Sequence, residues 1–216
     1  MAPGVHDLIQ LRPESVLLPE QNFPAWLPAA RKEPLWVVVR RGPMEGELVP
    51  IGVRGSQRHE RWAGLVRIND GLTIQRPDRL RIHLAQDSRR SLLAFQTLEY
   101  LECLLIGSNL NWGPRGSVGY ELASGVPAVR GSSDLDLVIF APEILSHTRA
   151  SELWQVCSSG PGRIDALVET PCCGFSLQEY ATSSTKKLLL RTPNGRMLGP
   201  DPWDLTSAEA GKTEVS

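Results

Sequence analysis

The run 134–140 (DLDLVIF) constrains the chain most, because it places two aspartates one residue apart inside an apolar segment. Alternate side chains of a β-strand share a face, so Asp134 and Asp136 are expected on one side and the leucines between and after them on the other. Neighbouring carboxylates repel each other and are costly to bury without a positive charge. A divalent cation such as Mg²⁺, which carboxylate oxygens suit, would meet that need. A turn cap at "SSD" followed by a solvated strand end is the open alternative.

Two further motifs flank this strand. Upstream, Gly116 and Ser117 open a helix predicted over 118–125, where helix N-terminal N–H groups can hold a phosphate and where Ser117 could equally be a plain N-cap. A competing Gly-Ser at 107–108 follows a long predicted helix and is interpreted as its C-terminal cap. Downstream, Asp165 lies in a second apolar strand and would bring a third carboxylate to the same edge if the two strands are neighbours.

Gly-Ser at a helix start, an alternating Asp-Leu-Asp strand and an Asp on the next strand together resemble the core of the nucleotidyltransferase superfamily. The run 116–139, with "GFSLQEYA" and "LLLRTPNGRML" further on, is similar to the phosphoribosyl-dephospho-CoA transferases of malonate decarboxylase, also called its holo-acyl-carrier-protein synthases. The likeness extends to "VPIGVRGSQRHERWAG" (49–64) and covers most of residues 5–205. Arg115 departs from it, because an apolar or aromatic residue is expected before the Gly-Ser turn.

The patterns and the resemblance predict an α+β protein in three segments. A small, Arg-rich N-terminal mixed domain (1–86) would bind substrate, a nucleotidyltransferase-type mixed sheet flanked by helices (87–205) would be catalytic, and 206–216 would be a disordered tail. The predicted strands are 35–41, 48–55, 63–70, 72–76, 134–140, 163–170 and two runs within 186–198. The predicted helices lie within 53–66, from Asp87, over 118–125, after Pro142 and over 176–183.

The resemblance implies a specific reaction. The chain would transfer the phosphoribosyl-dephospho-CoA prosthetic group from 2'-(5''-triphosphoribosyl)-3'-dephospho-CoA to a serine of the malonate decarboxylase acyl carrier protein and release diphosphate. Asp134 and Asp136 fall on the family's paired catalytic aspartates and would hold two Mg²⁺ (or Mn²⁺) ions, with Asp165 as third ligand or as base for the serine proton. Two alternatives stay open: a nucleotidyltransferase of the same fold with an ordinary NTP and another acceptor, and a non-catalytic interaction module.

The triphosphate of such a donor needs basic partners, and Arg suits phosphate through its rigid fork of donors. Basic residues outnumber acidic ones between residues 31 and 90, and nearly all are Arg. The expected phosphate-binding residues are Gly116, Ser117, Arg54, Arg58, Arg61 and Arg191, with Lys186 and Lys187 as further candidates. Arg58 and Arg61 would share a face if their segment is helical, and a solvated helix face is the open alternative.

The composition argues against several classes of protein. With 216 residues and a formal net charge of −1, the chain has room for two domains and no overall charge that favours nucleic acid or membrane binding. Its 4 cysteines form no CxxC pair, which indicates reduced thiols. Neither a signal peptide nor an apolar run of about 18 residues is visible, so a cytoplasmic location is expected.

Overall fold

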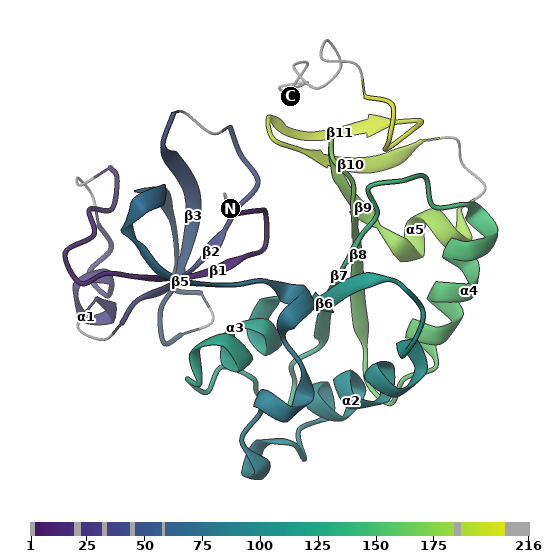
Figure 1. Ribbon diagram of the computed structural model, residues 1–216, viewed down its shortest axis with the longest axis horizontal. Coiled ribbons are helices and arrows are strands. Elements are labelled where there is room, and N and C mark those ends of the chain that lie inside the picture. The colour runs from purple at the N-terminus through teal and green to yellow at the C-terminus, as the bar shows by residue number, and fades with distance from the viewer. Residues whose placement is uncertain are drawn as a thin grey trace. The chain divides into compact units, whose positions relative to one another are not determined.

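The computed structural model (Figure 1) describes residues 3–19, 23–31, 34–43, 46–57, 59–183 and 187–205. The chain divides into two compact units, Met1–Arg76 and Pro77–Ser216. One unit contains an antiparallel sheet and the other a mixed sheet with helices, which confirms the predicted α+β class. The predicted disordered tail, 206–216, lies outside the described residues.

The first unit is an antiparallel sheet in the order β4-β3-β2-β1-β5. Its elements are β1 (Leu8–Leu11), α1 (Leu27–Ala30), β2 (Trp36–Val39), β3 (Leu48–Arg54), β4 (Arg61–Arg67), η1 (Ile68–Asp70) and β5 (Gly71–Gln75). Val49, Ile51 and Val53 alternate along β3 and are buried in the core of this unit. Burial of every second residue is what holds this sheet together.

The helix predicted within 53–66 is wrong. Val53 and Arg54 end β3 and residues 61–66 lie in β4, and the two strands pair as an antiparallel hairpin with Val53 opposite Trp62 and Arg54 opposite Arg61. Val53 and Val66 are both buried in the core of the unit, so packing in the sheet outweighs the helical propensity of the polar connection. Strand β1, which the sequence analysis did not predict, occupies the position between β2 and β5.

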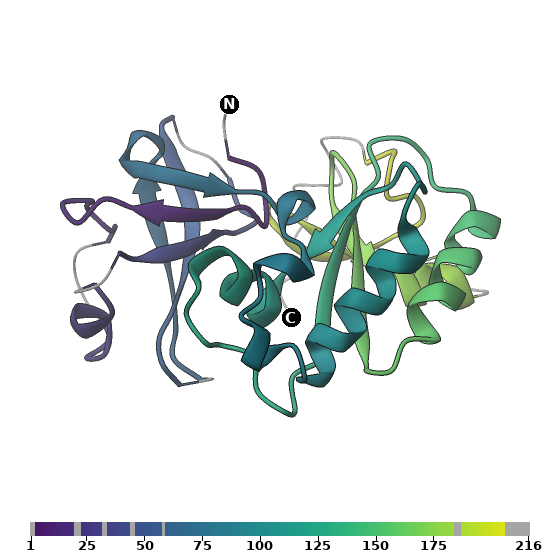
Figure 2. The same cartoon turned by 60° about the horizontal axis from the view of Figure 1, so that its bottom comes forward.

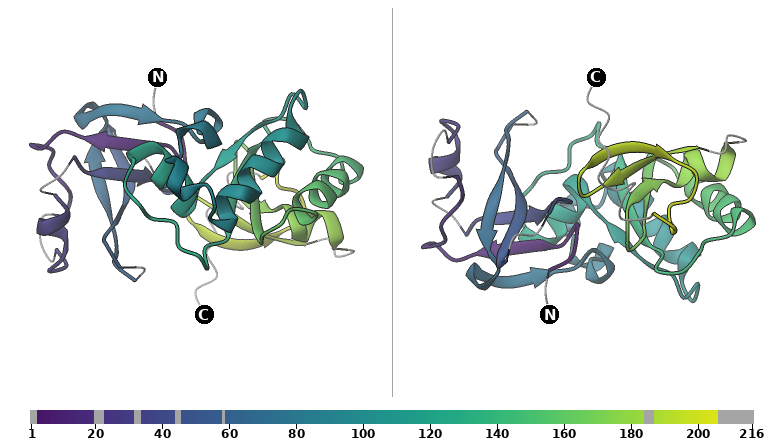
Figure 3. Two further views of the ribbon diagram at one scale, coloured as in Figure 1. Left: turned by 90° about the horizontal axis from the view of Figure 1, so that it is seen from below. Right: turned by 90° about the horizontal axis from the view of Figure 1, so that it is seen from above.

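The second unit contains a mixed sheet in the order β11-β10-β9-β8-β7-β6. Its strands are β6 (Asn111–Pro114), β7 (Leu135–Phe140), β8 (Ile164–Glu169), β9 (Gly174–Ser176), β10 (Leu188–Thr192) and β11 (Gly195–Gly199). The pair β7–β8 is parallel and the other pairs are antiparallel. Figure 3 shows the β10–β11 hairpin in yellow at one end of the sheet. The buried residues Leu135, Leu137 and Ile139 of β7 place this strand in the core.

Four α-helices accompany this sheet in the part of the unit that the structure describes. They are α2 (Leu93–Leu105), α3 (Gly116–Ser124), α4 (His147–Ser158) and α5 (Leu177–Thr182), preceded by the short 3₁₀ helices η2 (Pro77–Arg79), η3 (Ile82–Leu84) and η4 (Asp87–Arg89). Helix α2 packs against β7 and α4, and α4 and α5 pack against β8, as Figure 2 shows. None of the helices within the described ranges is long and apolar enough to cross a membrane.

Two predicted helix starts are wrong. Asp87 begins the 3₁₀ helix η4, and α2 begins only at Leu93, from where Phe95, Leu98 and Leu101 bury the predicted apolar face. The helix expected after Pro142 begins at His147, because the hydroxyl of Ser146 accepts the N–H of Arg149 and caps α4 there. A local side-chain cap thus determines a boundary that the apolar pattern alone cannot locate.

Candidate active site

The parallel strands β7 and β8 bring two acidic side chains together. Asp136 and Asp165 are register partners, so their side chains leave the same face of the sheet. Asp134 directly precedes β7, is exposed and has Arg163 4.0 Å from its carboxylate. The strands are therefore neighbours, as the sequence analysis required for the three aspartates to share one edge.

Arg115, which precedes α3, lies between two of these carboxylates. Its Nη2 donates to Oδ2 of Asp165 at 2.8 Å and lies 3.5 Å from Oδ1 of Asp136. Its Nε donates to the carbonyl of Leu137 at 3.0 Å, and its backbone N–H donates to the carbonyl of Asp136 at 2.9 Å. The sequence analysis missed Arg115 as a site residue, although its departure from the expected apolar residue was a usable signal.

Gly116 lets α3 begin directly against Asp136. Its φ is +63°, a left-handed conformation that favours glycine, and a β-carbon at this position would overlap the Asp136 carboxylate. Helix α3 begins at Gly116 and ends before Gly125 in a left-handed cap, as predicted. Ser117 lies inside the first turn and is half-buried, so it is not the N-cap residue. The competing Gly107 lies in the turn that follows α2.

The electrostatics of Asp136 show an incompletely compensated negative charge. Burial raises the pKa of the Asp136 carboxyl above its ordinary value, and the carboxylates of Asp165 and Asp134 raise it further. Arg115 and Arg191 lower this pKa but do not outweigh the other effects. An additional cation near Asp136 would therefore stabilise its ionised form.

The donor set fits a hard divalent cation better than a soft metal. The side chains that converge here carry carboxylate oxygens, and the lack of a side chain at Gly116 lets the Asp136 carboxylate lie against the start of α3. Within the described ranges, no group of three His, Cys, Asp or Glu side chains is arranged to form a metal site by itself. A Mg²⁺ ion here would thus take its remaining ligands from water and from a substrate phosphate.

Two arginines face each other at the end of the sheet. Arg191 in β10 is the register partner of Arg196 in β11, and on its other side it pairs with Gly174. Directly opposed like charges destabilise a strand pair, so this arrangement suits an anion bound between or beside them. The positive charge of Arg191 also lowers the pKa of the Asp136 carboxyl. Arg196 was not among the predicted residues.

The predicted arginines of the first unit have different surroundings. Arg54 and Arg61 are cross-strand partners in the β3–β4 hairpin, and Nη1 of Arg61 donates to the carbonyl of Glu60 at 2.9 Å. Arg58 and Lys186 lie outside the described residues. The expected shared helix face is therefore absent, because the described residues around Arg61 form a strand.

An ion pair between the partly exposed Arg89 and the buried Glu121 supports the segment that leads into Asp134. The carboxylate of Glu121 in α3 accepts hydrogen bonds from Nε and Nη2 of Arg89 at 2.8 and 3.0 Å. It also accepts hydrogen bonds from the backbone N–H groups of Ala128 and Val129, each at 2.7 Å. Burial raises the pKa of the Glu121 carboxyl, but the hydrogen bonds from Arg89, Val129 and Ala128 outweigh it and leave the pKa below its ordinary value. No sequence motif indicated this network, because its partners are far apart in the chain.

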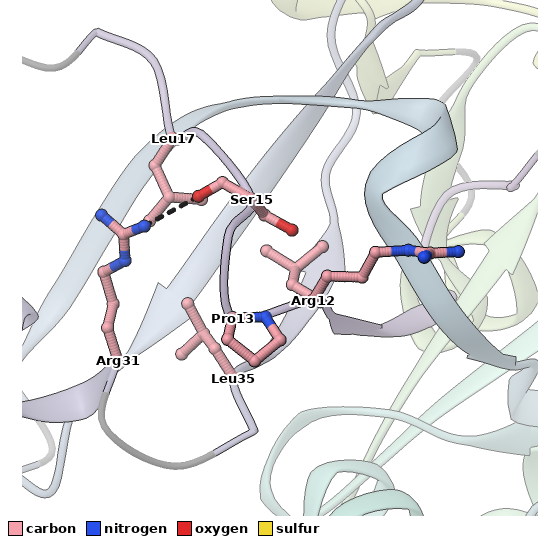
Figure 4. A pocket seen from close by; sticks show the side chains of 7 residues that line it. Arg12, Pro13, Ser15, Leu17, Arg31 and Leu35 are labelled. Carbon is pink, nitrogen blue, oxygen red and sulfur yellow. Dashed lines mark hydrogen bonds between the residues drawn. The ribbon is translucent and has the colours of Figure 1, made fainter.

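A small pocket in the first unit differs in character from the carboxylate cluster. It is lined by Leu11, Arg12, Pro13, Ser15, Leu17, Arg31 and Leu35 (Figure 4). Its open interior is about the size of one water molecule. Nη2 of Arg31 donates to the carbonyl of Ser15 at 2.7 Å across it. The acidic groups described above belong to the second unit.

Comparison with known proteins covers both units. Residues 4–77 match the family model described as "Phosphoribosyl-dephospho-CoA transferase MdcG N-terminal domain", and residues 80–202 match that of the C-terminal domain. A phosphoribosyl-dephospho-CoA transferase of Pseudomonas putida is 37% identical over 202 residues, 94% of this chain and 96% of that protein. The Pseudomonas aeruginosa protein of that name is 38% identical over 208 residues, 96% and 97% of the two chains. No solved structure matches the chain.

Proposed function

The chain belongs to the phosphoribosyl-dephospho-CoA transferase family, and from that membership we propose that its acceptor is a serine of the acyl carrier protein of malonate decarboxylase. The donor would be 2'-(5''-triphosphoribosyl)-3'-dephospho-CoA and the leaving group diphosphate. The observation that carries the proposal is the carboxylate cluster in which Asp136 and Asp165 are register partners beside Asp134. Acidic side chains gathered on one face of a sheet suit the transfer of a metal-bound phosphoryl group.

Asp134 and Asp136 are the residues proposed to hold Mg²⁺ or Mn²⁺. When bound, the metal would neutralise charge on the triphosphate and make its phosphorus more susceptible to attack. The main chain at Gly116 lies against the Asp136 carboxylate, so a phosphate held by a metal ion at Asp136 would lie beside the start of α3. The first N–H groups of α3 and the hydroxyl of Ser117 would donate to that phosphate.

The bond changes are those of a nucleotidyl transfer. The serine oxygen of the carrier forms a bond to the α-phosphorus, the bond from that phosphorus to the bridging oxygen of the β-phosphate breaks, and diphosphate leaves with the electron pair. The serine proton passes to a base. Asp165 can serve as that base or as a further metal ligand, since it is in register with Asp136.

Basic side chains would hold the phosphate groups away from the reacting atom. Arg191 is proposed to contact the leaving diphosphate, because its charge already acts on Asp136. Arg54, Arg58 and Arg61 are proposed to bind other phosphates of the donor. This proposal rests on the positive charge of the three side chains. Arg54 and Arg61 lie opposite each other in the β3–β4 hairpin, so their two charges are neighbours.

The experiment is the intact mass of purified apo acyl carrier protein after incubation with this protein, Mg²⁺ and the triphosphorylated donor. We expect a mass gain equal to the donor minus diphosphate, which Asp134→Ala and Asp136→Ala variants fail to produce. Asp87→Asn is the matched control and should retain activity, because the side chain of Asp87 is 96% exposed. An unchanged carrier mass with folded wild-type protein would reject this acceptor and donor, and a mass gain with ATP as sole donor would favour an ordinary nucleotidyltransferase.

A further inference from the structure

The cation already present in the carboxylate cluster is the guanidinium of Arg115. Its side chain is 16% exposed, whereas that of Asp136 is 32% exposed and that of Asp165 is 52% exposed. A charge this well covered is screened less by solvent than a surface charge. Arg115 therefore contributes to the field at both carboxylates before any ligand arrives.

Arg115 is held mainly by groups other than Asp136. Its guanidinium is fixed by Asp165 at 2.8 Å and by the carbonyl of Leu137 at 3.0 Å, while Asp136 is the more distant partner at 3.5 Å. The guanidinium would thus keep its place if the Asp136 carboxylate turned toward another cation. The ion pair with Asp165 is the anchor, and the contact with Asp136 is the weaker one.

The two oxygens of Asp136 have different surroundings. Oδ1 faces Arg115 across the 3.5 Å ion pair. Oδ2 lies against Gly116, where a β-carbon would overlap it. One oxygen is therefore compensated by a fixed positive charge, and the other lies against the main chain at the start of α3.

We propose that Arg115 is a resident counter-ion that sets the affinity of this cluster for a divalent cation. It compensates the carboxylates when no ligand is bound and repels a metal ion that binds alone, so that metal binds weakly until the anionic triphosphate arrives with it. The inference rests on the proposed function, since it concerns the same carboxylates. Arg115 is a positioning residue here, because it acts on the metal through the field and through Asp165.

If Arg115 had a purely structural role, its loss would change the metal affinity in the opposite direction. If the residue only tied the β6–α3 connection to β7 and β8, its loss would loosen the carboxylates and weaken metal binding. If it is a competing cation, its loss removes a repulsion and strengthens metal binding. The direction of the change therefore separates the two roles.

The test is the dissociation constant of Mn²⁺ for the full chain in the absence of donor. It is measured from the electron paramagnetic resonance signal of the Mn²⁺ that remains free. Arg115→Gln retains a hydrogen-bond donor without the charge, and Arg115→Met retains length only. Either neutral variant that keeps the wild-type circular dichroism is expected to bind Mn²⁺ about tenfold more tightly. Arg115→Lys keeps the charge and should stay within about threefold of wild type.

Arg149→Met is the control for loss of one positive charge, because Arg149 is exposed on α4 and pairs with Glu152 at 2.9 Å. It should leave Mn²⁺ affinity unchanged. Equal or weaker binding by a folded neutral variant would overturn the inference, and this includes the result that neither the wild type nor the neutral variants bind Mn²⁺.

The carrier-mass assay keeps this test separate from the proposed function. If the wild type modifies the carrier but neutral Arg115 variants bind Mn²⁺ no more tightly, only the inference about Arg115 fails. If Mn²⁺ binding changes as expected and the carrier mass does not, the donor or acceptor is wrong and the role of Arg115 stands.

Discussion

Asp136 and Asp165 are register partners on adjacent parallel strands, and the guanidinium of Arg115 contacts both carboxylates. Helix α4 connects the two strands in the chain, so residues far apart in sequence become neighbours on one sheet face. The pKa of Asp136 is raised first by burial and then by its acidic neighbours, so Arg115 and Arg191 together do not fully compensate its charge.

Asp136→Asn should abolish transfer and stabilise the fold. Activity is expected to fall by at least about 10³-fold, because a residue proposed to hold the metal ion would lose its charge. Because the folded-state pKa of Asp136 is raised, its ionised form costs stability at neutral pH, and a neutral amide removes that cost. Carrier mass and thermal unfolding at pH 7 measure the two effects, with Asp87→Asn as control. A lower Tm than wild type would contradict the electrostatic argument.

Gly116→Ala should reduce activity much more than Gly125→Ala, although both glycines have positive φ values of 63° and 72°. An added β-carbon overlaps the Asp136 carboxylate at the first position and meets nothing within 4 Å at the second. Both variants should lose about 1 kcal/mol from backbone strain. Only Gly116→Ala is expected to lose at least about tenfold in activity as well. Urea unfolding and carrier mass test this pair, and similar activity in both variants would count against the contact.

Arg191→Gln should lower kcat/KM for the donor by about 10- to 100-fold, since a charged hydrogen bond to phosphate contributes about 1.5–3 kcal/mol. Arg196→Gln, in its exposed cross-strand partner, should have a smaller effect of the same sign. Steady-state kinetics with varied donor measures both. Arg149→Gln on α4 is the control and should match the wild-type kcat/KM, while Arg191→Gln and Arg196→Gln should be at least as stable as wild type, because each removes one of two opposed like charges. An unchanged kcat/KM for Arg191→Gln would remove Arg191 from the phosphate site.

Glu121→Gln should destabilise the second unit by about 1–3 kcal/mol, because Arg89 would lose its buried charged partner. The folded-state pKa of Glu121 lies below its ordinary value of 4.5. Its stabilising effect is therefore fully present above pH 4.5 and is lost as the pH falls through the lower folded-state value. Chemical unfolding of both proteins from pH 7 to pH 3 should show a difference that shrinks on acidification. A difference that is constant with pH would contradict this assignment.

The sequence by itself determined the elements whose signals are local. Period-two alternation predicted the aspartate strand, helical spacing predicted the buried face of α2, and Gly125 marked the end of α3. These features depend on side chains within a few residues of each other, so local pattern suffices. The combination of Gly116, Asp134, Asp136 and Asp165 resembles the nucleotidyltransferase core, and the likeness of longer runs such as 116–139 predicted the family, which the family models confirm.

Only the tertiary structure decided which side chains meet. The hairpin that replaced the predicted helix around Arg61, the parallel pairing of β7 with β8, the Arg89–Glu121 ion pair and the position of Arg115 all depend on contacts between distant segments. Arg115 illustrates the reason: in the sequence it interrupts an expected apolar position, and only the neighbouring strands show that its charge meets Asp165 and Asp136. Charge compensation acts through space, so a linear pattern cannot specify it.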